Sequence, residues 1–372
     1  MHRNIVLACA ALLGIMPATR MAAQDSPVIQ SPEVRSDKTV VFRLWAPKAA
    51  EVQLSGDWMG TQPPVALSKD DQGIWMSTTM PLEPGIYTYA FLVDGARAPD
   101  PACRCTFAGG GGRFASSRFT IPGDKPSAWE IQNRPAGTLH YERFYSKLQQ
   151  RTRRFVVYTP NGYDSGSRRY PVLILTPGTP GDESDWTSGG GFADVLFDNL
   201  IADGRMEHML VVMHASDVDE RAPQRRGDEN LRQFETILAE ELVPVIKQRY
   251  RTNTNATSWA IAGLSLGGEF GMVAGLKHPE LFRTIISISG SFVASSIENR
   301  FGPALARQDL AKVYKLIWIG CGREDAFYPG AQALAQRLDS AKVPHVFRQF
   351  SGVHVMPVFR QELEEVLPKI FR

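Results

Sequence analysis

The segment Trp259–Phe270 reads WAIAGLSLGGEF, and it decides the fold of the chain. An apolar run typical of a buried strand ends at Ala262, and residues that favour a helix follow within a few positions. Between them, Ser265 has a glycine two residues away on each side, Gly263 and Gly267. Side chains at the glycine positions would collide with the adjoining strand and helix. The pattern predicts a sharp turn that presents a serine, and the alternative is an ordinary glycine-rich loop.

Buried strands and amphipathic helices alternate on both sides of this turn. Continuous apolar runs are typical of strands in the middle of a parallel sheet, and they occur at 170–178 (YPVLILTPG), 209–216 (MLVVMHAS), 284–290 (TIISISG) and 315–322 (KLIWIGCG). Apolar residues at helical spacing occupy 192–204, 229–250, 269–282, 330–341 and 356–371. This alternation predicts an α/β fold, a mostly parallel sheet with helices on both faces.

The N-terminal part of the chain has a different character. Residues 28–122 contain short runs rich in Val, Phe and Trp, such as 39–47 (TVVFRLWAP) and 85–95 (GIYTYAFLVDG), separated by Pro, Gly and Asp. Such runs without helical periods predict a small all-β sandwich. Residues 123–136 are rich in Pro and polar groups and predict a linker, so that the α/β domain spans 137–372.

The first residues, 1–23, predict a secretory signal peptide. Arg3 supplies a positive charge, residues 5–16 form a short apolar run, and Ala22 and Ala23 offer a cleavage neighbourhood. The run is shorter than the ~20 residues that a membrane span needs, and no later segment reaches that length. We therefore expect a secreted or periplasmic protein whose mature form has no membrane span.

Charge and cysteine content argue against several classes of function. The formal net charge of +2 falls to zero once Arg3 and Arg20 are removed with the signal peptide, so nucleic acid is not an expected partner. Three cysteines remain, an odd number that argues against a disulfide framework, and a Cys103–Cys105 bridge would close a very small, strained ring. No Cys/His cluster has zinc spacing, so neither a metal nor a cofactor is expected.

A nucleophilic serine needs a base, and the base needs a carboxylate to orient it. In α/β-hydrolases these partners follow the serine in the order acid, then histidine, on loops at the carboxyl ends of later strands. Asp325 lies just beyond the strand predicted at 315–319, and its neighbour Glu324 is the alternative acid. His354 follows a strand that ends near residue 350, whereas His345 lies inside that strand, where we expect an ordinary packing role.

Two backbone donors are also needed for the oxyanion that forms during acyl transfer. The N–H of Leu266, directly after the serine, is expected to supply one of them. The other should come from the loop 175–186 (LTPGTPGDESDW). Since Pro177 and Pro180 have no N–H, Thr179 is the candidate.

Residues 137–372 resemble the esterase D family, which contains the feruloyl and acetylxylan esterases of carbohydrate esterase family one. The segments that carry the resemblance are 153–163 (RRFVVYTPNGY), 170–186, 260–271 (AIAGLSLGGEFG), 319–334 (IGCGREDAFYPGAQAL) and 351–371. The resemblance implies an α/β-hydrolase fold, with the nucleophile, acid and base on Ser265, Asp325 and His354. Residues 40–58 and 85–95 resemble the early-set, immunoglobulin-like module found before such esterases, which is related to glycogen-binding modules.

Two positions depart from the family pattern. Relatives usually carry His-Gly after the second central strand, and this chain has Pro177 and Gly178 there. Proline stiffens the loop and removes a donor, but the Thr179 N–H remains, so we expect activity to survive. Met356 stands where many relatives have an aromatic residue, which weakens the case for an aromatic acyl group.

The resemblance implies hydrolysis of feruloyl or acetyl esters on a polysaccharide or oligosaccharide such as xylan. Trp186 and Phe327 are candidates for the acyl pocket. Trp58 and Trp75 are either sugar-stacking platforms or sandwich core, and we expect core. The alternatives are a siderophore esterase of enterochelin type, an acyltransferase of mycolyl type, and a carbohydrate-binding protein with a degenerate hydrolase domain. The sequence does not predict the oligomeric state.

Overall fold

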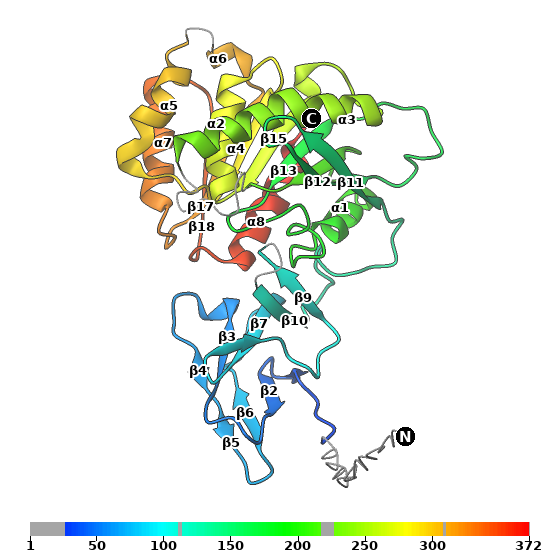
Figure 1. Cartoon of the computed structure of the whole chain (residues 1–372), viewed down its shortest axis with the longest axis vertical. Helices are drawn as coiled ribbons and strands as arrows, with labels where there is room; N and C mark the ends of the chain where they lie inside the picture. The colour runs from blue at the N-terminus through cyan, green and yellow to red at the C-terminus, as the bar shows by residue number, and fades with distance from the viewer. Residues whose placement is uncertain (1–26, 111–113, 217–226, 308–309, 372) are drawn as a thin grey trace, which may run out of the picture.

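The computed structural model describes residues 27–110, 114–216, 227–307 and 310–371. A small β-rich module, blue to cyan, lies below a larger α/β domain, green to red (Figure 1). The predicted signal peptide falls outside the described residues. Among those residues, none of the helices combines the length and apolar character that a membrane crossing requires.

The N-terminal module contains two antiparallel sheets, which confirms the predicted all-β sandwich. The sheet with the order β1-β2-β6-β5 consists of β1 (Glu33–Val34), β2 (Val40–Trp45), β5 (Ser68–Lys69) and β6 (Ile74–Thr78). The sheet with the order β4-β3-β7-β10-β9, with β8 beside β7, consists of β3 (Val52–Gly56), β4 (Val65–Ala66), β7 (Gly85–Val93), β8 (Ala96–Ala98), β9 (Thr106–Gly109) and β10 (Phe114–Ile121). A short 3-10 helix, η1 (Asp57–Met59), follows β3.

Both tryptophans that were candidates for sugar stacking contribute to the packing of this module. The Trp58 ring stacks on Phe42 with centroids 5.6 Å apart and meets Phe119 edge-on at 5.4 Å. Trp75 is buried, and its Nε1 donates to the carbonyl of Ala46. The expectation of a core role therefore describes both residues better than the platform alternative.

Cysteine pairing differs from the expectation. Cys103 and Cys105 form a disulfide, although their ring is small. Their Cα atoms lie 5.3 Å apart, which is within the normal range for a bridge. Cys321 is a buried free thiol.

The α/β domain is built on an eight-stranded sheet with the order β11-β12-β14-β13-β15-β16-β17-β18. The strands from β14 to β18 run parallel, while β12 pairs antiparallel with β14 and with β11. The strands are β11 (Thr138–Ser146), β12 (Arg151–Thr159), β13 (Val172–Thr176), β14 (Leu210–His214), β15 (Trp259–Leu264), β16 (Thr284–Ile288), β17 (Leu316–Gly322) and β18 (Val346–Phe350). The apolar runs at 170–178, 209–216, 284–290 and 315–322 thus form the predicted central strands.

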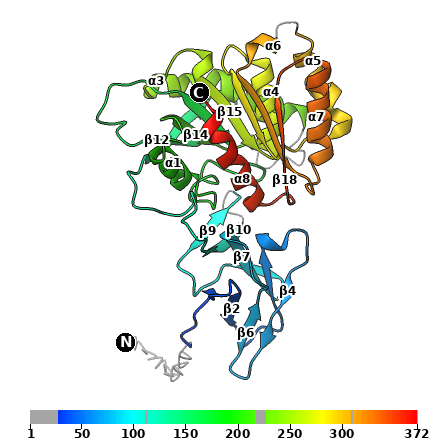
Figure 2. The same ribbon diagram turned by 180° about the vertical axis from the view of Figure 1, so that it is seen from behind.

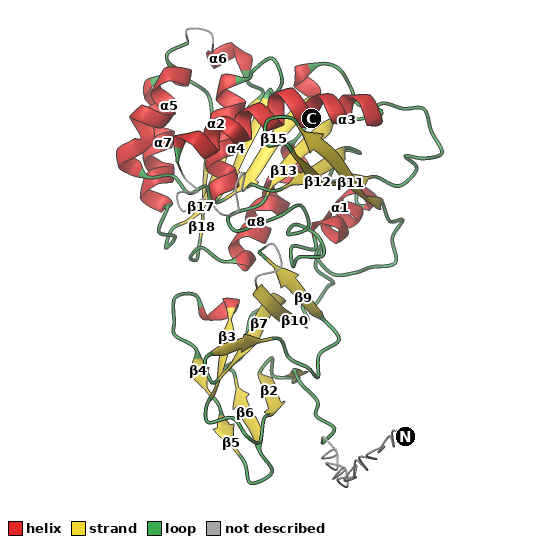
Figure 3. Cartoon of the chain, in the orientation of Figure 1, coloured by secondary structure: helices red, strands yellow, loops and turns green. Residues whose placement is uncertain are grey.

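Helices cover both faces of this sheet (Figure 3). Because side chains alternate along a strand, Val172 and Ile174 of β13 pack on one face and Leu173 and Leu175 on the other. The first face meets α2 (Asp228–Thr236), a π-helical turn (Ile237–Leu242), α3 (Val243–Arg249), α4 (Leu266–Lys277), α5 (Ile297–Leu305), α6 (Leu310–Val313) and α7 (Tyr328–Ser340). The second face meets α1 (Ala193–Ala202) and α8 (Met356–Val366). Short 3-10 turns are η3 (Ala256–Ser258), η4 (Ala294–Ser296) and η5 (Leu367–Lys369).

The segment predicted as a linker, 123–136, forms neither helix nor strand, and it lies against the α/β domain. Trp129 is buried, and its Nε1 donates to Glu364 of α8 at 3.1 Å. The Asn199 amide of α1 donates to the carbonyl of Ala128 at 2.8 Å. The module meets the α/β domain beside α8, as the view from behind shows (Figure 2).

Candidate active site

The turn at Ser265 is sharp and strained, as the glycine pattern predicted. Ser265 has φ 51° and ψ −118° between β15 and α4, a conformation that costs an L-residue about 1–3 kcal/mol. A Cβ on Gly263 would overlap the carbonyl of Gly267, and a Cβ on Gly267 would overlap the carbonyl oxygen of Pro177. Both glycines are therefore required by close backbone approaches, which argues against the alternative of an ordinary loop.

Neighbouring backbone groups hold this strained residue in place. The Ser265 N–H donates to the carbonyl of Ile288 at 3.0 Å. Its own carbonyl accepts from the N–H of Ser291 at 2.9 Å and of Glu269 at 3.0 Å. These three hydrogen bonds hold the turn in its strained conformation in the folded protein.

Asp325 and His354 form the second part of the site. Asp325 follows β17, its side chain is fully buried, and its Oδ2 lies 2.6 Å from His354 Nδ1. Its Oδ1 accepts the N–H of Phe327 at 2.9 Å, which fixes the carboxylate plane. The carboxylate thus selects the imidazole tautomer with the proton on Nδ1 and leaves Nε2 available as a base.

The neighbouring candidates take other roles. Glu324 is exposed and accepts the N–H of Gly352 at 2.6 Å, so it holds the loop that carries the histidine. His345 lies directly before β18 and not inside the strand, which corrects the prediction, and its Nδ1 lies 3.0 Å from the carbonyl of Val343. Of the two candidate acids, the geometry favours Asp325 over Glu324.

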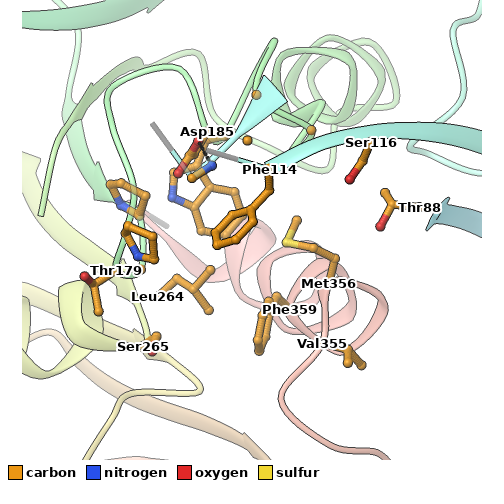
Figure 4. Close-up of a pocket in the computed structure, with 18 of the residues that line it drawn as sticks. Thr88, Phe114, Ser116, Thr179, Asp185, Leu264, Ser265, Val355, Met356 and Phe359 are labelled. Atoms are coloured by element: carbon orange, nitrogen blue, oxygen red, sulfur yellow. Dashed lines mark hydrogen bonds between the residues drawn. The ribbon is translucent and has the colours of Figure 1, made fainter. Parts of the chain in front are cut away.

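Ser265 and His354 line the same cavity, which has a volume of about 430 Å³. In the close-up, Ser265 and Thr179 lie on one side, and Thr88 and Ser116 lie on the opposite side (Figure 4). Apolar side chains line the cavity between these two ends, among them Phe114, Leu264, Met356 and Phe359. The cavity therefore offers a long apolar surface that begins at the serine.

The loop after β13 passes directly beside the serine. A Cβ on Gly178 would lie 3.1 Å from the Ser265 Cβ, and Thr179 lines the cavity. The Gly178 carbonyl accepts from Ser216 Oγ at 2.9 Å. Since the C=O and N–H of a trans peptide point in opposite directions, this bond turns the Thr179 N–H away from Ser216. Leu266 begins α4, and an N–H in the first turn of a helix has no acceptor within that helix.

The strand that leads into this loop is held by a buried histidine. His214 at the end of β14 is fully buried, and its Nε2 lies 3.1 Å from Thr176 Oγ1. Burial lowers the pKa of His214 to about 3, helped by the nearby positive charge of Arg153. The imidazole is therefore neutral at physiological pH and fixes the last residue of β13 before Pro177.

The N-terminal module supplies part of the cavity wall. Thr88 of β7, Phe107 of β9, and Phe114 and Ser116 of β10 all line it. The two domains are joined at this wall, because the Gly110 N–H donates to Asp185 Oδ1 at 3.0 Å. These residues were not predicted from the sequence, since no local pattern indicates that a strand of one domain will face the cavity of another.

The two predicted pocket residues behave differently. Trp186 lines the cavity, as expected. Phe327 does not line it, which corrects the prediction. Its ring packs edge-on against the His354 imidazole, with centroids 5.2 Å apart, because the turn after Asp325 directs it toward the base. Phe359 meets the same imidazole at 4.7 Å from another side and also lines the cavity.

Comparison with known families decides the class of the protein. Residues 146–370, more than half of the chain, match the family model described as "Putative esterase". The chain belongs to this esterase family. Residues 30–102 match carbohydrate-binding module 48, described as the isoamylase N-terminal domain. The predicted family and the predicted class of module are thereby confirmed.

Curated relatives of this esterase include a larger enzyme. An endo-1,4-beta-xylanase/feruloyl esterase of Xylanibacter ruminicola is 30% identical over 308 residues, which cover 81% of this chain and 40% of that protein. An uncharacterized protein of Corynebacterium glutamicum is 31% identical over 134 residues, covering 36% of this chain and 31% of that one. The chain thus spans less than half the length of these relatives.

Solved structures confirm the α/β-hydrolase fold of the esterase. The enterobactin esterase of Shigella flexneri superposes with a TM-score of 0.69 at 20% identity, covering 90% of this chain and 92% of that one. A ferulic acid esterase of Anaeromyces mucronatus, solved with ferulic acid, gives 0.57 at 17% identity, covering 68% and 98%. At such identities the likeness shows the fold alone.

A second buried carboxylate lies behind the site of this esterase. Glu362 of α8 is fully buried and accepts the N–H of Ser289 at 2.8 Å and its hydroxyl at 2.7 Å. Burial raises the pKa of Glu362 to about 8, the two bonds from Ser289 oppose that rise, and the negative charge of Asp325 adds to it. Among the described residues, no group of His, Cys, Asp and Glu is arranged to hold a metal ion.

Proposed function

We propose that this chain hydrolyses carboxylic esters through an acyl-enzyme on Ser265. The observation that carries the proposal is that His354, already paired with Asp325, lines one cavity together with the strained serine. His354 accepts the serine proton as Oγ attacks the ester carbonyl, and it then protonates the departing alcohol. Asp325 stabilises the imidazolium that forms. Water attacks the acyl-enzyme in the second half of the reaction, with His354 again as the base.

Backbone donors stabilise the charge that develops on the carbonyl oxygen. The N–H groups of Leu266 and Thr179 take this role in the proposal, since one begins α4 beside the serine and the other lies on the adjoining loop. Fixed dipoles at this point act without reorganising during the reaction. Pro177 has no N–H, so it contributes rigidity and not a hydrogen bond.

The cavity supports an acyl group larger than acetyl, of the hydroxycinnamoyl class. Its volume of about 430 Å³ lies in the range of small-molecule sites, roughly 300–1,000 Å³. The lining includes four aromatic side chains, which suit a planar acyl group: Phe107, Phe114, Trp186 and Phe359. Met356, the position where many relatives have an aromatic residue, also lines the cavity, and its thioether is compatible with an aromatic acyl group because sulfur packs well against aromatic rings. The match to carbohydrate-binding module 48 supports a polysaccharide or oligosaccharide as the esterified alcohol.

A siderophore ester is the second candidate, because the enterobactin esterase superposes over both domains. Ferric siderophores of this type are anionic and favour sites lined by cations. The described residues that line the cavity include Asp185 and neither Lys nor Arg. Among the described lining residues this charge favours a neutral aromatic ester, and the ester panel below tests the choice.

We also propose that the protein is exported. The charged start, the apolar run and the small residues at 22–23 support a cleaved signal peptide. The Cys103–Cys105 disulfide supports an oxidising compartment.

Rates on a panel of esters test the proposal. Wild-type protein and Ser265→Ala are assayed with methyl ferulate, p-nitrophenyl acetate, acetylated xylan and a catechol siderophore ester. We expect methyl ferulate to give the highest kcat/KM and Ser265→Ala to give no turnover. A higher rate on the siderophore ester would overturn the substrate class. Absence of turnover together with absence of fluorophosphonate labelling of Ser265 would favour a degenerate binding protein. Transfer to a sugar acceptor in preference to water would favour an acyltransferase.

A further inference from the structure

Arg360 is a buried cation on the helix that directly follows the proposed base. Its side chain projects from α8, which begins at Met356, and the residue is only 4% exposed. The guanidinium donates from Nη1 to the carbonyl of Ile86 at 2.8 Å and from Nη2 to the carbonyl of Gly190 at 3.0 Å. It also lies 5.8 Å from the centre of the Trp129 ring. One side chain thus contacts three segments that are far apart in the sequence.

The two carbonyls belong to different walls of the cavity. Ile86 lies on β7 of the module, two residues before Thr88, which lines the cavity. Gly190 itself lines the cavity, in the segment between the loop after β13 and α1. The third wall is α8, where Met356 and Phe359 face the same space. Arg360 therefore joins the walls from behind without entering the cavity.

The charge of Arg360 is balanced from across the domain boundary. Burial lowers the pKa of Arg360 to about 10, and the negative charge of Asp57 in the module opposes that fall. Asp57 in turn accepts the N–H of Thr88 at 3.0 Å and its hydroxyl at 2.9 Å. Burial raises the pKa of Asp57 to about 6, and the charge of Arg360 opposes that rise. Arg118 of β10 is the nearby like charge that lowers the pKa of Arg360 further.

A buried guanidinium is costly to desolvate, and apolar side chains often replace buried charges without loss of stability. Stability alone therefore does not account for an arginine here. A planar fork can bond two carbonyls on separate segments at fixed angles, whereas an ammonium is a point donor. This geometry suits a residue that fixes the relative position of two walls.

We propose that Arg360 is a positioning residue. It fixes the part of the cavity wall that contains Thr88 of β7 (the Thr88 wall) and the segment that contains Gly190 in position relative to α8. This arrangement determines which acyl groups fit the cavity. The inference rests on the proposed ester hydrolysis at Ser265. Acyl groups that extend to the Thr88 wall depend on this arrangement. An acetyl group, which stays near the serine, does not.

The test compares Arg360→Lys and Arg360→Met with wild type on methyl ferulate and p-nitrophenyl acetate. Arg348→Met is the matched control, because Arg348 is an exposed arginine of β18 that contacts the same helix through Glu365. For both Arg360 variants we expect kcat/KM for methyl ferulate to fall by roughly 10- to 100-fold, mainly through KM. The rate on p-nitrophenyl acetate and all rates of the control should stay within about threefold of wild type. Equal losses on both esters would overturn the inference, as would unchanged rates on both.

A double-mutant cycle keeps the inference testable if Arg360→Met does not fold. Thr88→Val removes the hydroxyl that donates to Asp57 while preserving the size of the side chain. If Arg360 acts through this wall, the KM effects of Arg360→Lys and Thr88→Val on methyl ferulate will be non-additive. Additive effects would contradict the inference. Wild-type protein that hydrolyses neither ester would instead refute the proposed function, so the two failures are distinguishable.

Discussion

Gly267, in the first turn of α4, lies directly against the carbonyl oxygen of Pro177. Any Cβ at this position would overlap that oxygen, so the glycine sets how closely the loop after β13 approaches the serine turn. We predict that Gly267→Ala displaces the loop and lowers kcat on p-nitrophenyl acetate by about 10²–10³, the usual effect of losing one oxyanion donor. Steady-state kinetics measure this loss.

Gly271 of the same helix provides the matched control. A Cβ there would lie 3.4 Å from Ile261 Cγ1, a contact that a small side-chain shift accommodates. Gly271→Ala should keep wild-type kcat and raise stability by up to ~1 kcal/mol, since alanine favours helix over glycine. If the two variants lose the same activity, the loss reflects helix packing and not the oxyanion loop.

The short contact between Asp325 and His354 predicts a large effect for an isosteric change of the acid. Asp325→Asn removes the acceptor that selects the Nδ1–H tautomer. We expect kcat to fall by roughly 10⁴-fold with little change in folding, the size seen for such changes in other triads. Glu324→Gln, measured beside it, should reduce kcat by less than about tenfold, because Glu324 bonds Gly352 and not the imidazole. A larger loss of kcat in Glu324→Gln than in Asp325→Asn would indicate that Glu324, and not Asp325, is the catalytic acid.

The sequence predicted those parts of the fold that are determined by residues close together along the chain. The alternation of apolar strands and amphipathic helices predicted the sheet, and the spacing of Gly263, Ser265 and Gly267 predicted the turn. The order of Ser265, Asp325 and His354 along the chain indicated three loops at one edge of the sheet, because parallel strands end at a common edge.

Contacts between the domains could not be predicted in this way. Thr88 and Phe114 reach the cavity only because the module docks on α8. In the sequence, Arg360 is one of several polar positions on an amphipathic helix, and nothing local marks it as a contact between domains. Phe327 was misassigned for a related reason. The sequence placed it near the acid, but the direction of the turn after Asp325 decided that it packs behind the imidazole.

We predict that the buried carboxyl group of Glu362 makes the stability of the folded protein depend on pH. Its pKa is about 8 in the folded protein, against an ordinary value of 4.5, so between these values the folded state retains a proton that the unfolded state has released. The contribution of Glu362 to stability is therefore greatest below pH 4.5 and is lost as the pH rises through 8. The expected slope is at most ~1.4 kcal/mol per pH unit in this window. Urea unfolding at several pH values measures it.

Glu362→Gln mimics the protonated acid, because its amide can accept from the Ser289 N–H and donate to the Ser289 hydroxyl. We expect this variant to fold and to flatten the decline between pH 4.5 and 8. Glu365→Gln is the control on the same helix. Hydrogen bonding by Arg348 lowers the pKa of Glu365, so this variant should leave the slope in that window unchanged. An unchanged slope in Glu362→Gln would show that Glu362 is already ionised across it.

We predict that the module contributes directly to acyl binding through Phe114. It is 47% exposed and lines the cavity, so its truncation should cause little loss of stability while removing an aromatic face from the acyl group. An aromatic contact is worth about 0.5–1.5 kcal/mol beyond area burial, and we expect Phe114→Ala to raise KM for methyl ferulate by up to about tenfold without changing kcat. Met76→Ala is the matched control, since Met76 is an equally exposed apolar residue of the module, also 47%, that does not line the cavity. A rise in KM in the control as large as that in Phe114→Ala would locate the effect in the module's stability, whereas a rise confined to Phe114→Ala would locate it in the cavity wall.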